Sequence, residues 1–229
     1  MAGSTRPSRV GFQELVTLFH SEVLPERQAV VLPGLAKAAA EEGFYLAGGT
    51  AVALRLGHRR SVDFDWFRTE EIGDPLAFAA GLRAKCRSLE VVETRKSTLH
   101  AVVDGVKASF LSYPYSLLHP PETWPTMGCP VASLDDLACM KLAAIGQRGA
   151  RRDFIDLHFI LHGGTHLRGL LDLYRSKFAV ADVAHLLVAL TYFDDARREP
   201  LPTMLMPLDW EALEEDLRRM VKDAVLPAG

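Results

Sequence analysis

Apolar residues recur along the chain with two different periods, and the balance between these periods changes near residue 130. Up to that point, the helical period predicts helices over residues 12–24, 29–42, 51–57 and 74–88. Short or alternating apolar runs predict strands in FYLAGG from Phe44, in SVDFDWF from Ser61, and over 90–94, 98–103 and 106–112. The Asp104-Gly105 pair between the last two strands predicts a tight hairpin.

Beyond residues 114–130, a segment with five prolines, only the helical period continues. It predicts helices over 133–145, 151–162, 167–177, 180–193 and 209–224. Asp209 is placed to cap the last helix, because its side chain can accept hydrogen bonds from exposed backbone amides. The stripe of Leu186, Leu187 and Leu190 is typical of a buried helix face. We therefore predict an α+β first half and an all-helical second half, with a hinge near residue 120.

Composition narrows the class of protein. The chain has 229 residues, of which 48% are hydrophobic, which suffices for one large domain or two small ones and excludes a disordered chain. The net charge of -3 gives no support for nucleic-acid binding by the whole surface, so any such site has to be a local basic patch. Three cysteines without a CxxC pair, no apolar signal-peptide core and no membrane-length apolar run predict a cytoplasmic protein with no membrane partner.

Two acidic residues interrupt the apolar strand that begins at Ser61. Side chains alternate between the faces of a strand, so Asp63 and Asp65 are expected on one face, with their Cβ atoms about 6–7 Å apart. Two carboxylates at this spacing suit Mg²⁺, which binds one or two carboxylates together with water and substrate phosphates. The alternative is a solvent-facing strand side that carries acids without a cation.

A glycine-rich turn lies shortly before this strand, and the turn and both acids fall within eighteen residues. Gly48 and Gly49 stand between a predicted strand and a predicted helix, where exposed amides attract phosphate. Thr50 is a candidate helix cap or phosphate ligand, and tight turns also use glycine for geometry alone. Because Arg59 and Ser61 lie in the same stretch, the turn and the two acids together indicate a nucleotide site.

This stretch, GGTAVALRLGHRRSVDFDWF, resembles the first motif of the AbiEii-like nucleotidyltransferase toxins of the DNA polymerase β-like superfamily. The family pattern is met by Gly48, Gly49, Thr50, Arg59, Ser61, Asp63 and Asp65. The resemblance implies a polymerase β-like core over residues 1–120, a small mixed sheet with flanking helices. It also implies an all-helical domain over 121–229 that closes the active-site cleft.

A second motif resembles the same family. The stretch KLAAIGQRGARRDFIDLHFIL places Lys141, Arg148, Arg152, Asp153 and Asp156 on the family's positions. On one continuous helix, Lys141, Arg148, Arg152 and Asp156 would lie within about 80° of one another. An ordinary Arg152–Asp156 ion pair on a solvated helix face is the alternative. Gly146 and Gly149 weaken a helix, so a bend or break is expected between them.

The resemblance implies a Mg²⁺- or Mn²⁺-dependent enzyme that moves a nucleoside monophosphate from an NTP to an acceptor. Asp63 and Asp65 would hold the metal, while Lys141 and Asp156 would act beside it. Asp156 would orient Lys141 or serve as a base. The NTP phosphates would meet Gly48, Gly49, Thr50, Arg59, Ser61, Arg148 and Arg152. The implied acceptor is RNA such as the 3′ end of tRNA, and the implied protein partner is a cognate antitoxin.

One position departs from the superfamily pattern. Relatives usually have a third carboxylate on the neighbouring strand, where this chain has Ser109. Asp104, in the predicted hairpin, is expected to lie too far away to replace it. The departure keeps a second hypothesis open, namely a degenerate, non-catalytic module that binds nucleotides or another protein.

Three histidines spaced by four, His158, His162 and His166, raise the question of a zinc site. Gly163-Gly164 is expected to end the helix before His166, and no nearby thiolate completes a ligand set. The sequence therefore favours ordinary core or surface histidines.

Overall fold

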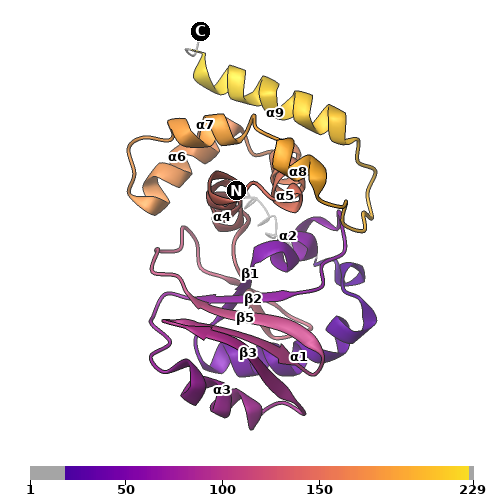
Figure 1. The fold of residues 1–229 in the computed structure, drawn as a ribbon, viewed down its shortest axis with the longest axis vertical. Coiled ribbons are helices and arrows are strands. Elements are labelled where there is room, and N and C mark those ends of the chain that lie inside the picture. Colours follow the sequence, from indigo (N-terminus) through magenta and orange to yellow (C-terminus); the bar gives the residue numbers. More distant parts are fainter. Residues whose placement is uncertain (1–18, 227–229) are drawn as a thin grey trace, which may run out of the picture.

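The computed structural model describes residues 19–226, and Figure 1 shows a sheet half below a helical half. The helices and strands of the first half are η1 (Ser21–Val23), α1 (Glu26–Glu41), β1 (Tyr45–Ala47), α2 (Gly48–Leu56), β2 (Phe64–Arg68), α3 (Pro75–Arg83), β3 (Leu89–Arg95), β4 (Thr98–Val103) and β5 (Val106–Ser112). They are followed by β6 (Glu122–Trp124), β7 (Cys129–Val131), α4 (Leu134–Gln147), α5 (Arg151–His162), α6 (Leu167–Phe178), α7 (Ala184–Ala189), α8 (Asp194–Arg198) and α9 (Trp210–Val225). The helix predicted over 12–24 falls mostly outside the described residues.

The seven strands form one mixed sheet in the order β3-β4-β5-β2-β1-β7-β6. β2 is parallel to β5, and β1 is parallel to β7, whereas the remaining neighbours are antiparallel. The predicted Asp104-Gly105 hairpin is confirmed, since both residues have the positive φ angles that this turn requires. The mixed sheet with flanking helices agrees with the predicted fold class.

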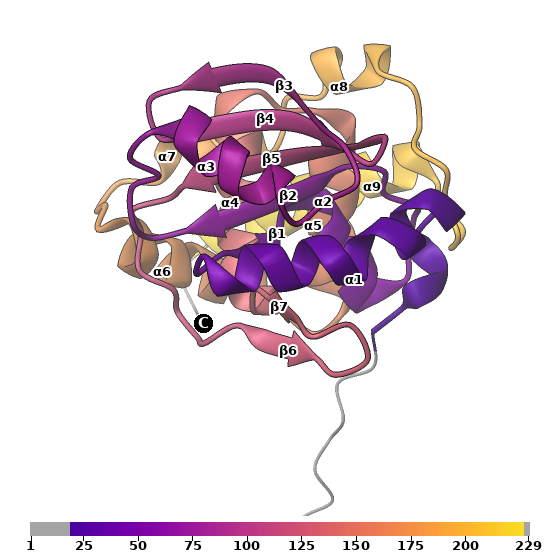
Figure 2. The same ribbon diagram turned by 90° about the horizontal axis from the view of Figure 1, so that it is seen from below.

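The two faces of the sheet are covered by different helices. Figure 2 shows α1 and α3 across one face, while α4 and α5 lie behind the sheet. Alternation along β2 sends Phe64 and Trp66 into the core, where Trp66 stacks on Phe110 of β5. Phe78 of α3 packs on the same Phe110 ring. Asp65 therefore points to the opposite face, toward the helical half, which explains an acid between buried aromatic residues.

Two helices of the second half begin at residues whose side chains cap them. Ser133 caps α4 by accepting a hydrogen bond from the Asp136 amide at 3.1 Å. The predicted cap at Asp209 is confirmed, because its carboxylate accepts from the amides of Glu211 and Ala212. Leu186 and Leu190 are fully buried, as the leucine stripe predicts. No helix among residues 19–226 is long and apolar enough to span a membrane.

Two sequence predictions differ from the structure. The proline-rich segment is not only a linker, because it contains β6 and β7, and β7 pairs with β1. The helix predicted over 180–193 is only the short α7, and residues 194–198 form the additional helix α8. The break expected near Gly146 and Gly149 is confirmed, because the helix is interrupted at residues 148–150, where Gly149 has φ +56°. The division at residue 120 remains a prediction, although the sheet continues beyond it.

Candidate active site

The turn between β1 and α2 lies directly against β2. Ala47 is paired with Asp65 across the two strands, and α2 begins at the next residue, Gly48. Gly48 has φ +64°, and a Cβ atom there would lie 2.4 Å from the Asp65 Oδ2 atom. Glycine is needed here for both reasons, the left-handed backbone and the close approach of a carboxylate. The unpaired amides of the first turn of α2 consequently lie beside Asp65.

Asp63 and Asp65 form the acidic centre of the site. β2 begins at Phe64, so Asp63 lies one residue before the strand rather than on it, and both side chains are half-buried. Neither carboxylate forms a direct ion pair with any residue that the structure describes. Burial raises the pKa of Asp65, and the Asp63 charge raises it further, against the opposing effect of Lys141. Two neighbouring carboxylates that raise each other's energy and have no direct ion-pair partner among the described residues fit a divalent cation.

Ser109 lies where the motif resemblance predicts it, opposite Asp65 on the parallel strand β5. Against the effect of burial, its hydroxyl helps to lower the pKa of Asp65. His100 Nδ1 of β4 lies 3.0 Å from the Ser109 Oγ atom, so a row of polar side chains leads from β4 through Ser109 toward Asp65.

The segment between α2 and β2 is fixed to the helix through Thr50. Its hydroxyl lies 2.8 Å from the Ser61 Oγ atom and also close to the carbonyl oxygen of Asp63. Thr50 is buried within the first turn of α2, whose N-cap is Ala47, so the expected capping role is wrong. In the structure, Thr50 holds the backbone that carries Asp63.

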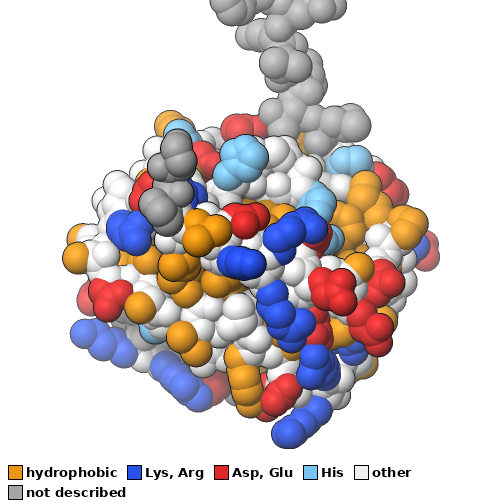
Figure 3. All heavy atoms as spheres, turned by 90° about the horizontal axis from the view of Figure 1, so that it is seen from above, with side chains coloured by type: hydrophobic (Ala, Val, Ile, Leu, Met, Phe, Trp, Pro, Cys, Tyr) orange, Lys and Arg blue, Asp and Glu red, His pale blue; other side chains and the backbone are white. Residues whose placement is uncertain are grey.

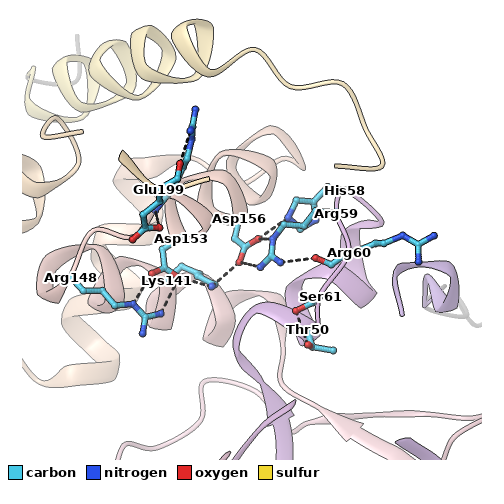
Figure 4. Close-up of polar contacts among 11 residues, drawn as sticks. Thr50, His58, Arg59, Arg60, Ser61, Lys141, Arg148, Asp153, Asp156 and Glu199 are labelled. Carbon is cyan, nitrogen blue, oxygen red and sulfur yellow. Dashed lines mark hydrogen bonds and ion pairs between the residues drawn. The ribbon is translucent and has the colours of Figure 1, made fainter. Parts of the chain in front are cut away.

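Asp156 of α5 joins the two halves of the molecule. Arg59 binds its carboxylate with two nitrogens, Nε at 2.6 Å and Nη2 at 2.8 Å. His58 Nε2 contacts the same carboxylate at 2.8 Å. His58 and Asp156 have no exposed surface, and Arg59 is 3% exposed. The bidentate contact commits Arg59 to Asp156, as Figure 4 shows.

Lys141 of α4 continues this network. Its Nζ atom lies 2.7 Å from Asp156 Oδ2 and 2.7 Å from Asp153 Oδ1. Asp153 in turn accepts from Arg148 Nε at 3.0 Å, so three basic and two acidic side chains form one line in Figure 4. The Arg152–Asp156 ion pair, the alternative interpretation of this motif, is absent from this described network, since Asp156 is bound by Arg59, His58 and Lys141. Arg152 is exposed instead.

The charges in this network hold one another ionised. Burial alone would raise the pKa values of Asp153 and Asp156, but neighbouring cations outweigh it and both values are lowered. Lys141 and Arg148 act on Asp153, while Lys141 and Arg59 act on Asp156. Lys141 and Arg152 also lower the pKa of Asp65 against its burial, so positive charge surrounds the acidic centre.

Most of the predicted residues meet at this place, where the sheet half faces the helical half. Three further residues belong to the arrangement: His58, His100 and Asp153. Asp153 was visible as part of the second sequence motif. His58 and His100 had no signal of their own. His58 stands in the loop after α2 without a recognisable partner, and His100 stands between apolar residues, where a histidine is as typical of a core as of a site. Only the strand register brings His100 beside Ser109.

The chain matches a protein family over residues 30–118 and 105–228, and the family is described as the nucleotidyl transferase AbiEii toxin of type IV toxin–antitoxin systems. The chain belongs to the AbiEii family. It is therefore a nucleotidyltransferase of a toxin family, as the motif resemblance implied. Members of this class generally use divalent metal ions, which agrees with the pair of carboxylates at the centre of the site.

The chain is also similar to a protein of known sequence and to proteins of known structure. An uncharacterized protein of Aquifex aeolicus is 40% identical over 182 residues, which cover 79% of this chain and 87% of that protein. The crystal structure of JHP933 from Helicobacter pylori has a TM-score of 0.54 at 16% identity and covers 90% of each chain. MenT4, a nucleotidyltransferase toxin of Mycobacterium tuberculosis, has a TM-score of 0.50 at 17% identity, with 91% and 88% covered. At these identities the two structures show the fold alone.

Proposed function

We propose that this chain transfers a nucleoside monophosphate from an NTP to an RNA acceptor such as the 3′ end of tRNA. The observation that carries the proposal is the position of Asp63 and Asp65. Asp65 lies beside the first turn of α2 and within the electrostatic reach of Lys141, Arg148 and Arg152. Asp63 is joined to the same turn through Thr50, whose hydroxyl contacts the Asp63 carbonyl oxygen. An anionic triphosphate and a cation have complementary partners at this place.

Asp63 and Asp65 are the residues that would hold Mg²⁺ or Mn²⁺. When bound there, the ion supplies Lewis-acid stabilisation of the charge that develops on the phosphoryl oxygens. Ser109 lies opposite Asp65 on β5, where its hydroxyl favours the ionised form of that carboxylate. The amides of Gly48 and Gly49 and the hydroxyl of Ser61 are the proposed donors to phosphate oxygens, and Arg148 and Arg152 are the proposed cationic partners.

Arg59 and Asp156 are better suited to positioning than to contact with the substrate. Asp156 is fully buried and its pKa is lowered, so it would be a poor base toward an acceptor hydroxyl. It holds Lys141 Nζ at 2.7 Å, and Lys141 has a third N–H for which residues 19–226 provide no partner. We assign Lys141 to the triphosphate and Asp156, with Arg59, to the orientation of Lys141.

The RNA acceptor is proposed from local charge. With a net charge of -3, the molecule has no general affinity for a polyanion, so contact must come from basic side chains near the site. Arg60, Arg148 and Arg152 carry exposed guanidinium groups there. In Figure 4 the Arg60 side chain points away from Asp156, and no described residue accepts from it.

The family description also supports two broader proposals. A type IV toxin has a cognate antitoxin, so we propose that such a protein counteracts this chain in the cell. We also propose that the chain acts in the cytoplasm, where NTP and tRNA are present.

The test is incubation of the purified protein with each α-³²P-labelled NTP, total tRNA, and either Mg²⁺ or Mn²⁺. Label is expected in RNA with one preferred nucleotide, and it should be lost with D63N, with D65N and on chelation of the metal. The control is D104N, which removes an acid in the β4–β5 turn. Asparagine tolerates the φ of +48° at that position.

Full transfer by a D63A/D65A protein would refute the mechanism. Label in protein rather than in RNA would refute the proposal that RNA is the acceptor. If the intact chain binds NTP and metal but labels no acceptor, the degenerate module with Ser109 in place of the third carboxylate is the better account.

A further inference from the structure

Helices α5 and α9 bring two histidines and one aspartate together outside the active site. His158 and His162 lie one helical turn apart on α5, and Asp216 lies on the C-terminal helix α9. One ligand atom from each residue lies within 4.8 Å of the others. His162 Nε2 and Asp216 Oδ2 are 2.9 Å apart. The third ligand could not be found from the sequence spacing of the histidines, because it lies more than fifty residues further along the chain.

Hydrogen bonds orient two of these three groups. His162 Nδ1 lies 2.9 Å from the carbonyl oxygen of His158, so Nδ1 is the protonated nitrogen that donates. This leaves Nε2 directed at Asp216. Metal-binding histidines are oriented in this way, with one nitrogen donating to a backbone carbonyl and the other free for the metal. Asp216 is held from its other side by Arg219.

His158 has an unused donor or acceptor. Its Nδ1 atom is buried and has no hydrogen-bond partner in the described part of the chain. Buried polar atoms in native proteins are usually hydrogen-bonded, so an unpartnered one leaves room for a ligand. A zinc ion bound to this imidazole would use the lone pair of the neutral ring.

We propose that His158, His162 and Asp216 bind a Zn²⁺ ion that fastens the C-terminal helix α9 to α5. Two imidazoles and one carboxylate are a ligand set that zinc accepts, with water in the fourth position of a tetrahedron. Bonds of about 2.0–2.1 Å place the ligand atoms about 3.3 Å apart. The candidate ligand atoms lie within 4.8 Å of one another, so the side chains would rotate slightly to take up this spacing around an ion.

The site is separate from the nucleotide site but mechanically connected to it. α5 also carries Asp153 and Asp156, which hold Lys141 and Arg59. Figure 3 views the end of the molecule that α9 covers. Basic and acidic side chains are mixed there, and histidine side chains reach the surface. A zinc ion on this face would stabilise the helix that supports the active-site network without touching the substrate.

The experiment uses the full chain, freed of metal by chelation and then saturated with Mg²⁺, which occupies carboxylate sites and leaves imidazole sites open. Isothermal titration with Zn²⁺ should show one site per chain. At a zinc concentration of 100 times Kd, the midpoint of thermal unfolding should rise by about 5–10 °C. H162Q and D216N should bind at least about 100-fold more weakly, whereas H166Q should bind normally. His166 is an exposed histidine outside the cluster and provides the matched control.

A second measurement needs no variant. In ¹⁵N-histidine-labelled wild-type protein, Zn²⁺ should shift the ring nitrogens of two of the eight histidines, those of His158 and His162. Absence of saturable binding to the Mg²⁺-saturated protein would overturn the proposal. So would undiminished binding by the H162Q/D216N double variant, or zinc-induced shifts confined to other histidines. Catalytic activity is not part of the readout, so failure here is independent of the proposed RNA transfer.

Discussion

At the scale of single residues, the contact between Gly48 and Asp65 has the most direct consequence. In a G48A variant, the added Cβ would meet Asp65 Oδ2, and the backbone would keep an unfavourable φ of +64°. We expect a loss of about 1–2 kcal/mol in unfolding free energy from the backbone alone. Displacement of the carboxylate should reduce nucleotidyl transfer by at least about 100-fold. Urea unfolding and the labelling assay measure the two effects.

G81A is the matched control for that variant. Gly81 lies in α3, its φ is not positive, and an added Cβ would meet nothing within 4 Å. Alanine should stabilise the helix there by up to about 1 kcal/mol and leave transfer unchanged. A G48A protein with wild-type activity would contradict the proposed place of Asp65 in the mechanism.

Arg60 tests the RNA acceptor at the same scale. If its guanidinium contacts one phosphate, R60Q should weaken RNA binding and reduce the slope of log K against log salt by about 0.7 to 0.9. The Kd for NTP should change little. R95Q is the control, because the Arg95 side chain is 74% exposed on β3, away from the site. Equal salt slopes for R60Q and the wild type would exclude Arg60 from the RNA contact.

At this scale, only some of the site residues could be predicted from the sequence. Asp63, Asp65, Gly48 and Gly49 were predictable, because their order and spacing in one local motif define their geometry. Ser109 was predictable as the residue opposite Asp65. The partners of Asp156 were not predictable as a set. Arg59 and His58 are nearly one hundred positions away from it in the chain, and only the packing of α2 against α5 brings them into contact.

At the scale of elements, the end of α6 makes a clear prediction. The helix ends at Ala179, an exposed residue with φ +52°, a position that usually favours glycine. A179G should therefore raise the unfolding free energy by about 1 kcal/mol. The same change in the exposed middle of α3, A80G, should lower it by up to about 1 kcal/mol. Changes of equal sign in urea unfolding would contradict the left-handed end of α6.

Element prediction from sequence succeeded where the signal was local. The Asp104-Gly105 hairpin, the Asp209 cap and the glycine-containing break after α4 were all recognised from a few residues. β6 and β7 were missed because each has only three residues among prolines, and they are strands only through pairing with β1 and each other. α7 proved shorter than expected because apolar spacing continues past Ala189, where the helix has already ended.

At the scale of the whole molecule, the Asp156 network predicts how stability depends on pH. The pKa of Asp156 is lowered in the folded state, so its contribution is complete above the unfolded value of about 3.9. That contribution is lost as pH falls below this value toward the folded pKa. We expect the unfolding free energy to decrease between about pH 4 and 2, more shallowly in D156N by up to about 1.4 kcal/mol per pH unit. Urea unfolding across this range measures the slope.

The D156N variant needs a control for its pH slope, and it also loses stability at neutral pH. D172N removes an aspartate whose side chain is 69% exposed, so its pH slope should stay close to that of the wild type. D156N should also lose about 3–5 kcal/mol at neutral pH, because Arg59 and Lys141 remain buried with an uncompensated charge. A D156N slope equal to that of the wild type would show that Asp156 is not preferentially ionised by the fold.

The parallel pairing of β1 with β7 has a consequence for biosynthesis. About 80 residues separate the two strands, and the β2–β5 pair is complete well before β7 emerges from the ribosome. At 5–20 residues per second, the edge of β1 waits roughly 4–16 s for its partner. During that interval the nascent chain presents an unpaired apolar edge, which is the kind of surface that chaperones recognise and that promotes aggregation. A truncated product that stops at residue 120 would keep this edge permanently, so incomplete translation yields an aggregation-prone fragment rather than a smaller working enzyme.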